Sequence, residues 1–187
     1  MSEVWLFRHA ETEWSVSGRH TGRTDIPLTA TGRRRGARTA ARIAGHEWAA
    51  VLSSPLGRAR ETAALAGLGD RAVDRDDLLE WDYGDYEGIT TKEIQGNRPG
   101  WSLWADGCPG GEQAADVGAR VDRVIEEALD AGGDVAIFAH GHVLRVLGAR
   151  WVQEPPQFGG RLALSTASIC VLGLEHGTRV VWRWNAT

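Results

Sequence analysis

Three short apolar runs, each followed by a segment with a helix pattern, constrain the fold of this chain more than any other feature. They are Val4–Phe7, Ala49–Leu52 and Val135–Phe138. An apolar run of this length without alternation is typical of a strand that is covered on both faces. Strands that alternate with helices build a mainly parallel sheet. The pattern therefore predicts an α/β fold, in the form of a three-layer α/β/α sandwich.

The intervals between these runs carry helix signals. Ser54-Pro55 offers an N-cap and a proline at the first helical position, so we predict a helix from there to about Gly67. Residues 81–111, rich in Trp, Gly and Asp, fit no pattern, and we predict a lid or loop insertion there within one domain spanning 1–187. The other predicted elements are helices over 30–45, 112–131 and 143–152, and a closing hairpin of Ile169–Leu174 and Arg179–Trp184.

Composition narrows the class of protein. A chain of 187 residues, 42% hydrophobic and 25% charged, is neither disordered nor fibrous. Its net charge of −4 argues against a binder of nucleic acid or of a membrane surface. Met1-Ser2-Glu3 leads into Val4–Phe7 without the regions of a secretory signal, so we expect a cytoplasmic protein. Cys108 and Cys170 lack the CxxC spacing of a cysteine-rich metal site.

Polar residues follow the three predicted strands at the points where those strands end. Arg8-His9 follows the first, Ser53-Ser54 and then Arg58 follow the second, and His140 follows the third. The carboxyl ends of parallel strands lie along one edge of a sheet, where ligands bind. Two histidines and two arginines would meet there beside helix N-termini, which favour anions. The sequence therefore predicts a pocket for a phosphoryl group.

Five segments, in order along the chain, together form a recognisable pattern. They are Arg8-His9-Ala10-Glu11-Thr12, Thr21-Gly22-Arg23-Thr24-Asp25-Ile26-Pro27-Leu28-Thr29, Ser53-Ser54-Pro55-Leu56-Gly57-Arg58-Ala59, Glu80 before Tyr83-Gly84-Asp85-Tyr86-Glu87-Gly88, and His140-Gly141-His142. This pattern resembles the histidine phosphatase superfamily, the phosphoglycerate-mutase-like or RHG enzymes. Ala10 stands where the family usually has glycine, and Ser15 where many members have asparagine. The resemblance implies a phosphoglycerate-mutase-like fold for almost the whole chain.

The resemblance also implies a role for each core residue. His9 is the expected nucleophile, which forms a phosphohistidine. Arg8 and Arg58 are expected to clamp the phosphoryl oxygens, with a cationic His140 as a further donor. Glu80 is expected to protonate the leaving alkoxide and then to activate water. The expected substrate contacts are Ser15, Thr21, Gly22, Gly141, Arg19, His20 and Arg23.

Other interpretations of these residues remain open at this point. His140-x-His142 has the form of a metal pair, but no third ligand is evident, so we expect no metal and no cofactor. His142 is interpreted as a structural residue, and helix-spaced arginines on 30–45 as a solvated face. The alternatives to Glu80 are Asp82, Asp85 and Glu87. Three tryptophans wall the pocket or pack in the core: Trp81, Trp101 and Trp104.

Within the family, a phosphatase is the favoured interpretation. A mutase holds a second acidic group with an arginine pair on an insertion, and the segment Ile89–Ala139 is poor in basic residues. The sequence also resembles a phosphatase branch with actinobacterial acid phosphatases and the fungal sedoheptulose bisphosphatase. We therefore expect hydrolysis of small phosphorylated metabolites, sugar phosphates or bisphosphates. The alternatives are a cofactor-dependent phosphoglycerate mutase and a catalytically silent phosphate-binding protein. Strand Val180–Trp184 is a candidate edge for a homodimer.

Overall fold

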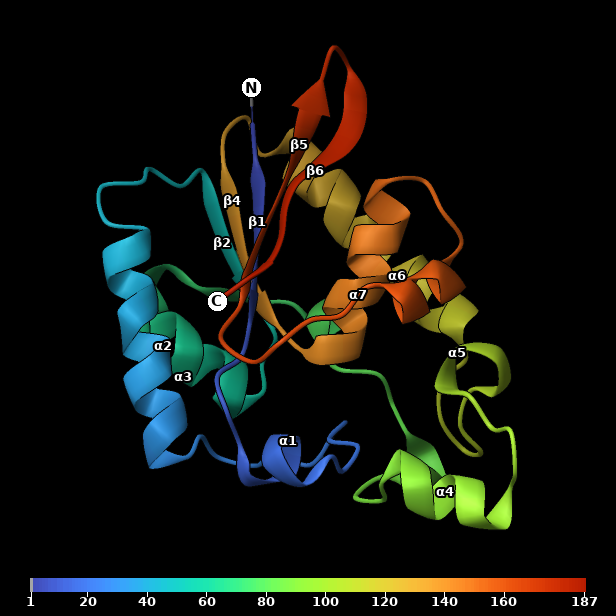
Figure 1. Ribbon diagram of the computed structural model, residues 1–187. Coiled ribbons are helices and arrows are strands. Elements are labelled where there is room, and N and C mark those ends of the chain that lie inside the picture. Colours follow the sequence, from blue (N-terminus) through green and yellow to red (C-terminus); the bar gives the residue numbers. More distant parts are fainter. Residues whose placement is uncertain (1) are drawn as a thin grey trace.

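The computed structural model describes residues 2–187, and in that part of the chain a six-stranded sheet forms the centre (Figure 1). The two strands at the C-terminal end of the chain are antiparallel and the others are parallel, so the sheet is mainly parallel as predicted. In spatial order the strands are β3 (Val73–Asp74), β2 (Ala50–Ser53), β4 (Val135–Ala139), β1 (Val4–Arg8), β5 (Ile169–Glu175) and β6 (Thr178–Ala186).

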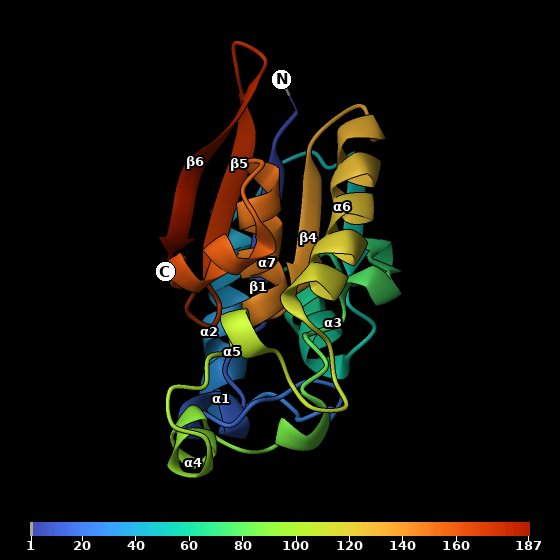
Figure 2. The same ribbon diagram turned by 90° about the vertical axis from the view of Figure 1, so that its right-hand side faces the viewer.

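Helices cover both faces of this sheet. Helices α2 (Ala30–Arg42) and α3 (Gly57–Leu65) lie on one face, and α6 (Ala114–Asp130) and α7 (Gly141–Trp151) lie on the other (Figures 1 and 2). Successive strand residues point to opposite faces, and each face has its own buried cluster. Side chains of β1 show the alternation, because Leu6 packs in the cluster beneath α6 and α7, and Phe7 in the other. The predicted α/β/α sandwich is confirmed.

Two of the predicted elements begin at different residues in the structure. Helix α3 begins at Gly57 with Leu56 at its N-cap, and the predicted cap at Ser54 is wrong. Instead, the Ser54 hydroxyl lies 2.7 Å from Nε2 of His140, so it serves the strand-end cluster and not the helix. Helix α7 begins at Gly141, two residues before its predicted start. Helix α7 therefore begins two residues after the end of β4, and α3 begins four residues after the end of β2.

The carboxyl ends of β1, β2 and β4 lie at the same end of the molecule, the lower end in Figure 1. Arg8 pairs with Ala139 and Ser53 with Phe138, so the residues that follow these strands emerge side by side. Short elements surround this end of the sheet (Figure 2). They are α1 (Glu13–Ser17), α4 (Thr91–Asn97), α5 (Leu103–Asp106) and the 3₁₀ turns η2 (Asp76–Leu78), η3 (Gly84–Tyr86) and η4 (Pro156–Arg161). A further 3₁₀ turn, η1 (Gly69–Arg71), precedes the parallel strand β3 and lies at the opposite end of the sheet.

The segment 81–111, predicted to be a lid or loop insertion, contains the helices α4 and α5, which were not predicted. Both helices are short, and Thr90 caps the first through a capping box with Glu93. Trp101 and Leu103 anchor the segment, because both are buried against the cluster beneath α6 and α7. Over residues 2–187, no helix has the length and apolar character that crossing a membrane requires.

Candidate active site

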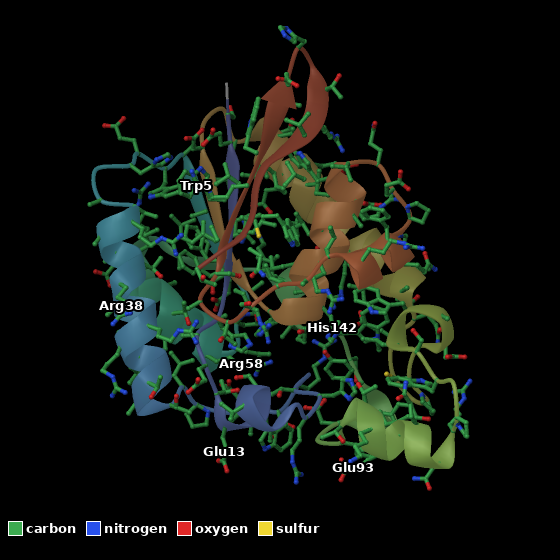
Figure 3. The ribbon with its side chains drawn as sticks, viewed as in Figure 1. Trp5, Glu13, Arg38, Arg58, Glu93 and His142 are labelled. Carbon is green, nitrogen blue, oxygen red and sulfur yellow. The ribbon has the colours of Figure 1, made fainter. Side chains whose placement is uncertain are left out.

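A cavity of about 430 Å³ opens where β1 and β4 end. Its volume lies in the range of small-molecule sites, roughly 300–1,000 Å³, so it has room for a whole metabolite. Figure 3 shows Arg58 and His142 at this end of the sheet, Arg58 beside α3 and His142 below α7. The inner lining comes from Arg8, His9, Glu80, Tyr83, Gly141 and His142.

His9, which follows β1, is held as a neutral imidazole. Its Nδ1 lies 2.7 Å from the Ala10 carbonyl and donates to it, so Nε2 keeps its lone pair. Burial, with the positive charges of Arg8 and Arg58, holds the pKa of His9 well below its ordinary 6.5. Ala10, which stands where the family usually has glycine, does not have a positive φ, so alanine fits this position without backbone strain.

Arg8 also lines this cavity, and its guanidinium contains a buried donor without a partner in the described part of the chain. One of its terminal nitrogens donates to the Leu164 carbonyl. Its Nε–H is buried and has no hydrogen-bond partner among residues 2–187. A buried donor without a partner costs free energy, which a bound oxyanion would recover. Gly141 lies directly against this guanidinium, because a Cβ built there would be 3.2 Å from Cζ of Arg8.

Arg58 and His140 form a buried pair behind His9. Arg58 donates from Nη1 to the Thr24 carbonyl at 2.9 Å and from Nη2 to the Gly22 carbonyl at 2.9 Å. Its Nε donates to Nδ1 of His140 at 3.1 Å, so that ring nitrogen is an acceptor. The other nitrogen of His140 then donates to the Ser54 hydroxyl.

The prediction of a cationic His140 is therefore wrong. Burial and the Arg58 charge hold the pKa of His140 well below 6.5, and the ring is neutral. His140 is fully buried, and its ring centroid lies 5.2 Å from that of His9. The structure thus brings His140 beside His9, where it orients Arg58. Because both ring nitrogens already have partners, a metal pair with His142 is excluded in this arrangement.

Glu80 is the one of the four candidate acids that lines the cavity. Its Oε1 accepts from the backbone N–H groups of Trp81 and Val143, both at 2.9 Å, and its Oε2 accepts from that of His142 at 2.9 Å. Three backbone N–H groups thus hold the two carboxylate oxygens, and two of these donors belong to the first turn of α7. Of the other acids, Glu87 binds the backbone N–H of Gly22.

The predicted outer contacts divide into two groups. Ser15, Arg19, His20, Thr21 and Gly141 line the cavity. Two others do not line it: Gly22 is buried against Glu87, and Arg23 forms an ion pair with Asp82 at 3.5 Å.

Ser15, an expected substrate contact, lines the cavity, but the hydrogen of its hydroxyl is already bound within the protein. Its hydroxyl donates to the Thr12 carbonyl at 2.8 Å and accepts from the Thr12 N–H at 2.9 Å. The bond accepted from the Thr12 N–H is half of the capping box of α1. A short helix that the sequence did not predict thus determines what this hydroxyl can do.

Residues that the sequence did not assign to substrate binding complete the lining. His142 lies 2.6 Å from the Tyr83 hydroxyl through Nδ1, and burial holds its pKa well below 6.5. Trp101 and Trp104 form part of the wall, whereas Trp81 is buried behind it. Arg145 also lines the cavity; its position four residues after Gly141, on the same helix face, was the signal for it.

Comparison with known proteins agrees with this geometry. A family model described as histidine phosphatase superfamily (branch 1) matches residues 4–187. An acid phosphatase of Mycobacterium tuberculosis is 45% identical over 183 residues, which cover 93% of this chain and 87% of that protein. A sedoheptulose 1,7-bisphosphatase of Saccharomyces cerevisiae is 37% identical over 179 residues, which cover 78% of this chain and 66% of that protein.

A solved structure of a related protein has the same fold. The product of an open reading frame of Mycobacterium tuberculosis superposes with a TM-score of 0.94 and is 42% identical, and the match covers 100% of this chain and 98% of that one. The chain therefore belongs to the histidine phosphatase superfamily, branch 1, and it is a phosphohydrolase.

Proposed function

We propose that this chain hydrolyses phosphomonoesters of small metabolites, sugar phosphates or bisphosphates among them, through a phosphohistidine on His9. The main support for this proposal is the protonation state of the His9 ring. Its Nδ1 is bound to the Ala10 carbonyl, and its Nε2 keeps a lone pair at the cavity. A neutral imidazole beside two guanidinium groups is suited to in-line attack on phosphorus.

The first step transfers the phosphoryl group to the enzyme. The lone pair of Nε2 forms the N–P bond while the P–O bond to the leaving group breaks, and the leaving alkoxide takes a proton from Glu80. Arg8 offers its unpartnered Nε–H to the phosphoryl oxygens. Donors already fixed before the reaction stabilise the charge that develops in the transition state.

The second step releases inorganic phosphate. Water attacks phosphorus, the Glu80 carboxylate takes the water proton, and the N–P bond breaks to restore neutral His9. The three backbone donors to Glu80 support this role, because they fix its carboxylate at the wall of the cavity.

The basic residues of the segment Ile89–Ala139 support hydrolysis over mutase action. The arginines of this segment are ion-paired away from the cavity: Arg98 with Asp106, Arg120 with Glu112 and Arg123 with Asp77. Lys92 does not line the cavity either. The arginine pair that a mutase insertion would supply has no counterpart here, so water is the proposed acceptor.

Trapping the phosphoenzyme tests the proposal. Wild-type protein mixed with a ³²P-labelled sugar phosphate and quenched rapidly is expected to give an acid-labile phosphoprotein and free phosphate. His9→Gln is expected to give neither, because the nucleophile is lost. His46→Gln is the control, since His46 pairs with Asp134 outside the cavity. Label on folded His9→Gln would refute a phosphohistidine at this position, and a wild-type protein without label or turnover would support the silent binding protein.

We also propose that the protein assembles as a homodimer. A homodimer through β6 is supported by its place at the edge of the sheet and by the exposure of Trp182, 50%. Sedimentation of the wild type and of Trp182→Ser tests the dimer, and a wild type that sediments as a monomer would refute it.

Three further proposals concern the segment 81–111 and the setting of the protein. We propose that 81–111 forms the outer wall of the cavity, that the protein is cytoplasmic, and that it binds no nucleic acid.

A further inference from the structure

We propose that Arg145, held between Trp104 and the Gly159-Gly160 turn, is a second anion subsite, and that the preferred substrates carry another oxyanion besides the phosphoryl group that is removed. This inference rests on the proposed function, because it extends the same cavity. It concerns an arginine that neither the predicted site nor the proposed reaction uses.

The Arg145 guanidinium is fixed along one edge. Its Nε–H donates to the Gly159 carbonyl at 3.0 Å and its Nη2 donates to the Gly160 carbonyl at 3.3 Å. A guanidinium has five N–H donors. The remaining three, two on Nη1 and one on Nη2, have no hydrogen-bond partner among residues 2–187. They lie along the end of the guanidinium, in the geometry that binds a phosphate or carboxylate through two oxygens.

The surrounding residues hold this group in place. Cζ of Arg145 lies 4.6 Å from the centre of the Trp104 ring, which covers one face of the guanidinium. Two glycines let the indole approach. A Cβ on Gly159 would lie 2.8 Å from the ring, and one on Gly160 would lie 3.0 Å from it. Trp104 of α5 and the backbone of η4 thus together orient the single positive charge of Arg145 on α7.

This charge has no acidic partner. The other arginine of α7, Arg150, pairs with Asp122 at 2.9 Å, whereas Arg145 takes part in no ion pair within the described chain. Burial lowers the pKa of Arg145, and the negative charge of Glu80 counteracts this. A half-buried, unpaired cation is costly unless an anion joins it.

The position of Arg145 fits a second group on the same substrate. Arg145 and Arg8 line one cavity, and the Arg8 charge is close enough to contribute to the lowered pKa of Arg145. Arg8 and His9 hold the phosphoryl group that is transferred. The cavity of about 430 Å³ leaves space for a carbon chain between that group and Arg145. The substrate class is therefore a phosphomonoester with a second phosphate or a carboxylate.

Paired substrates test this subsite. One pair is a sugar 1,6-bisphosphate and the matching monophosphate, and the other is a phosphoglycerate and glycerol phosphate, so the two oxyanions are compared separately. Wild type is expected to prefer at least one member with two anionic groups. In Arg145→Gln the KM for that member is expected to rise about 10- to 100-fold with little change in kcat, because uniform binding is lost. The single-anion partner is expected to change by less than about threefold.

Two further variants separate charge from folding. Arg145→Lys keeps a charge without the planar fork and is expected to fall between wild type and Arg145→Gln. Arg150→Gln, on the same helix but outside the cavity, is expected to leave the preference unchanged. The inference is overturned when Arg145→Gln keeps the wild-type preference or lowers the rates on both members equally.

An inhibition experiment tests the subsite in the wild-type protein alone. Non-hydrolysable phosphonates with and without a second oxyanion are compared as competitive inhibitors of aryl phosphate hydrolysis. The compound with two anionic groups is expected to bind at least about tenfold more tightly. Equal inhibition constants would overturn the subsite and leave the His9 chemistry standing. Failure of the proposed function itself is distinct, because the wild type would then form no phosphoenzyme from any of these substrates.

Discussion

At Gly141, a single missing Cβ sets how closely α7 approaches the catalytic centre. A Cβ there would lie 3.2 Å from Cζ and 3.3 Å from Nε of Arg8. Both distances are tight contacts, so a methyl group would displace the guanidinium by a few tenths of an ångström. That guanidinium carries the buried Nε–H without a partner, so its displacement changes the donor offered to phosphate.

We expect Gly141→Ala to separate activity from stability. Alanine is a better helix former than glycine, so the free energy of unfolding is expected to stay unchanged or rise slightly. The value of kcat/KM on a sugar phosphate is expected to fall about tenfold, because phosphoryl transfer depends on positioning. Urea unfolding and steady-state kinetics check the two parts. Wild-type kcat/KM in this variant would show that Arg8 does not need its present position.

The residues of the catalytic site were predictable where their role depends on residue type and on their order along the chain. Arg8, His9, Glu80 and Gly141 all line the cavity as the sequence suggested. The protonation of His140 was not predictable, because it follows from an Arg58 hydrogen bond between residues 82 apart in sequence. Whether a histidine is neutral depends on its partners in space, and those are not visible in a strand-end motif.

At the scale of elements, Glu80 joins two parts of the chain. The N-cap residue of α7, His140, gives no side-chain cap to this helix. The Glu80 carboxylate takes that place, because it accepts from the N–H groups of His142 and Val143. A buried carboxylate more than sixty residues earlier thus caps the helix that carries Gly141 and Arg145.

We therefore expect Glu80→Gln to affect both stability and catalysis. Loss of the charge and of acceptors for buried N–H groups is expected to lower the free energy of unfolding by about 1–3 kcal/mol. Phosphorylation by a sugar phosphate is expected to slow roughly 10²- to 10⁴-fold, and phosphorylation by an activated aryl phosphate much less, since its leaving group needs no proton. Rapid-quench measurement of the phosphoenzyme isolates this step from the later use of Glu80 as a base.

A second capping carboxylate provides the control. Asp116 belongs to the capping box of α6 and is exposed. Asp116→Asn is expected to lower stability modestly and to leave the phosphorylation rates unchanged. Equal slowing of Glu80→Gln on both substrates would mean that Glu80 only supports α7, and its role as the acid would then be lost.

Helices and strands were predictable from the sequence where a single hydrophobic pattern determines their position. Strands β1, β2 and β4 coincide with apolar runs, because burial on both faces leaves a continuous pattern. The start of α3 was not predictable from Ser54-Pro55, because the Ser54 hydroxyl is taken by His140. Helix α5 is only four residues long, so its packing against η4, and with it the Arg145 subsite, leaves no periodic signal.

At the scale of the whole molecule, the catalytic end contains several buried histidines that the fold keeps neutral. Burial is the main cause that holds the pKa values of His9, His140 and His142 well below 6.5. The same burial keeps His9 able to attack phosphorus in acid. In the unfolded chain each of these rings regains an ordinary pKa and binds a proton as the pH falls through about 6.5.

This difference in proton binding gives the folded protein a sensitivity to acid. Below pH 6.5 the unfolded state binds more protons than the native state, so stability rises with pH and is lost as the pH falls. The window runs downward from 6.5 to the lowered native pKa values. Each histidine that stays neutral contributes up to about 1.4 kcal/mol per pH unit, so three together contribute up to about 4 kcal/mol per unit.

We expect urea unfolding to show this loss between about pH 7.5 and about pH 5, against a typical total stability of roughly 5–15 kcal/mol. His142→Gln is expected to reduce the slope of stability against pH by about one proton, because one neutral ring is removed. His176→Gln is the matched control: His176 is exposed in the turn between β5 and β6, and its removal is expected to leave the slope unchanged. A wild-type stability that stays flat over this range would show that the buried histidines take up protons without unfolding. The nucleophile would then lose its lone pair in acid as well, and hydrolysis would cease there in a protein that is still folded.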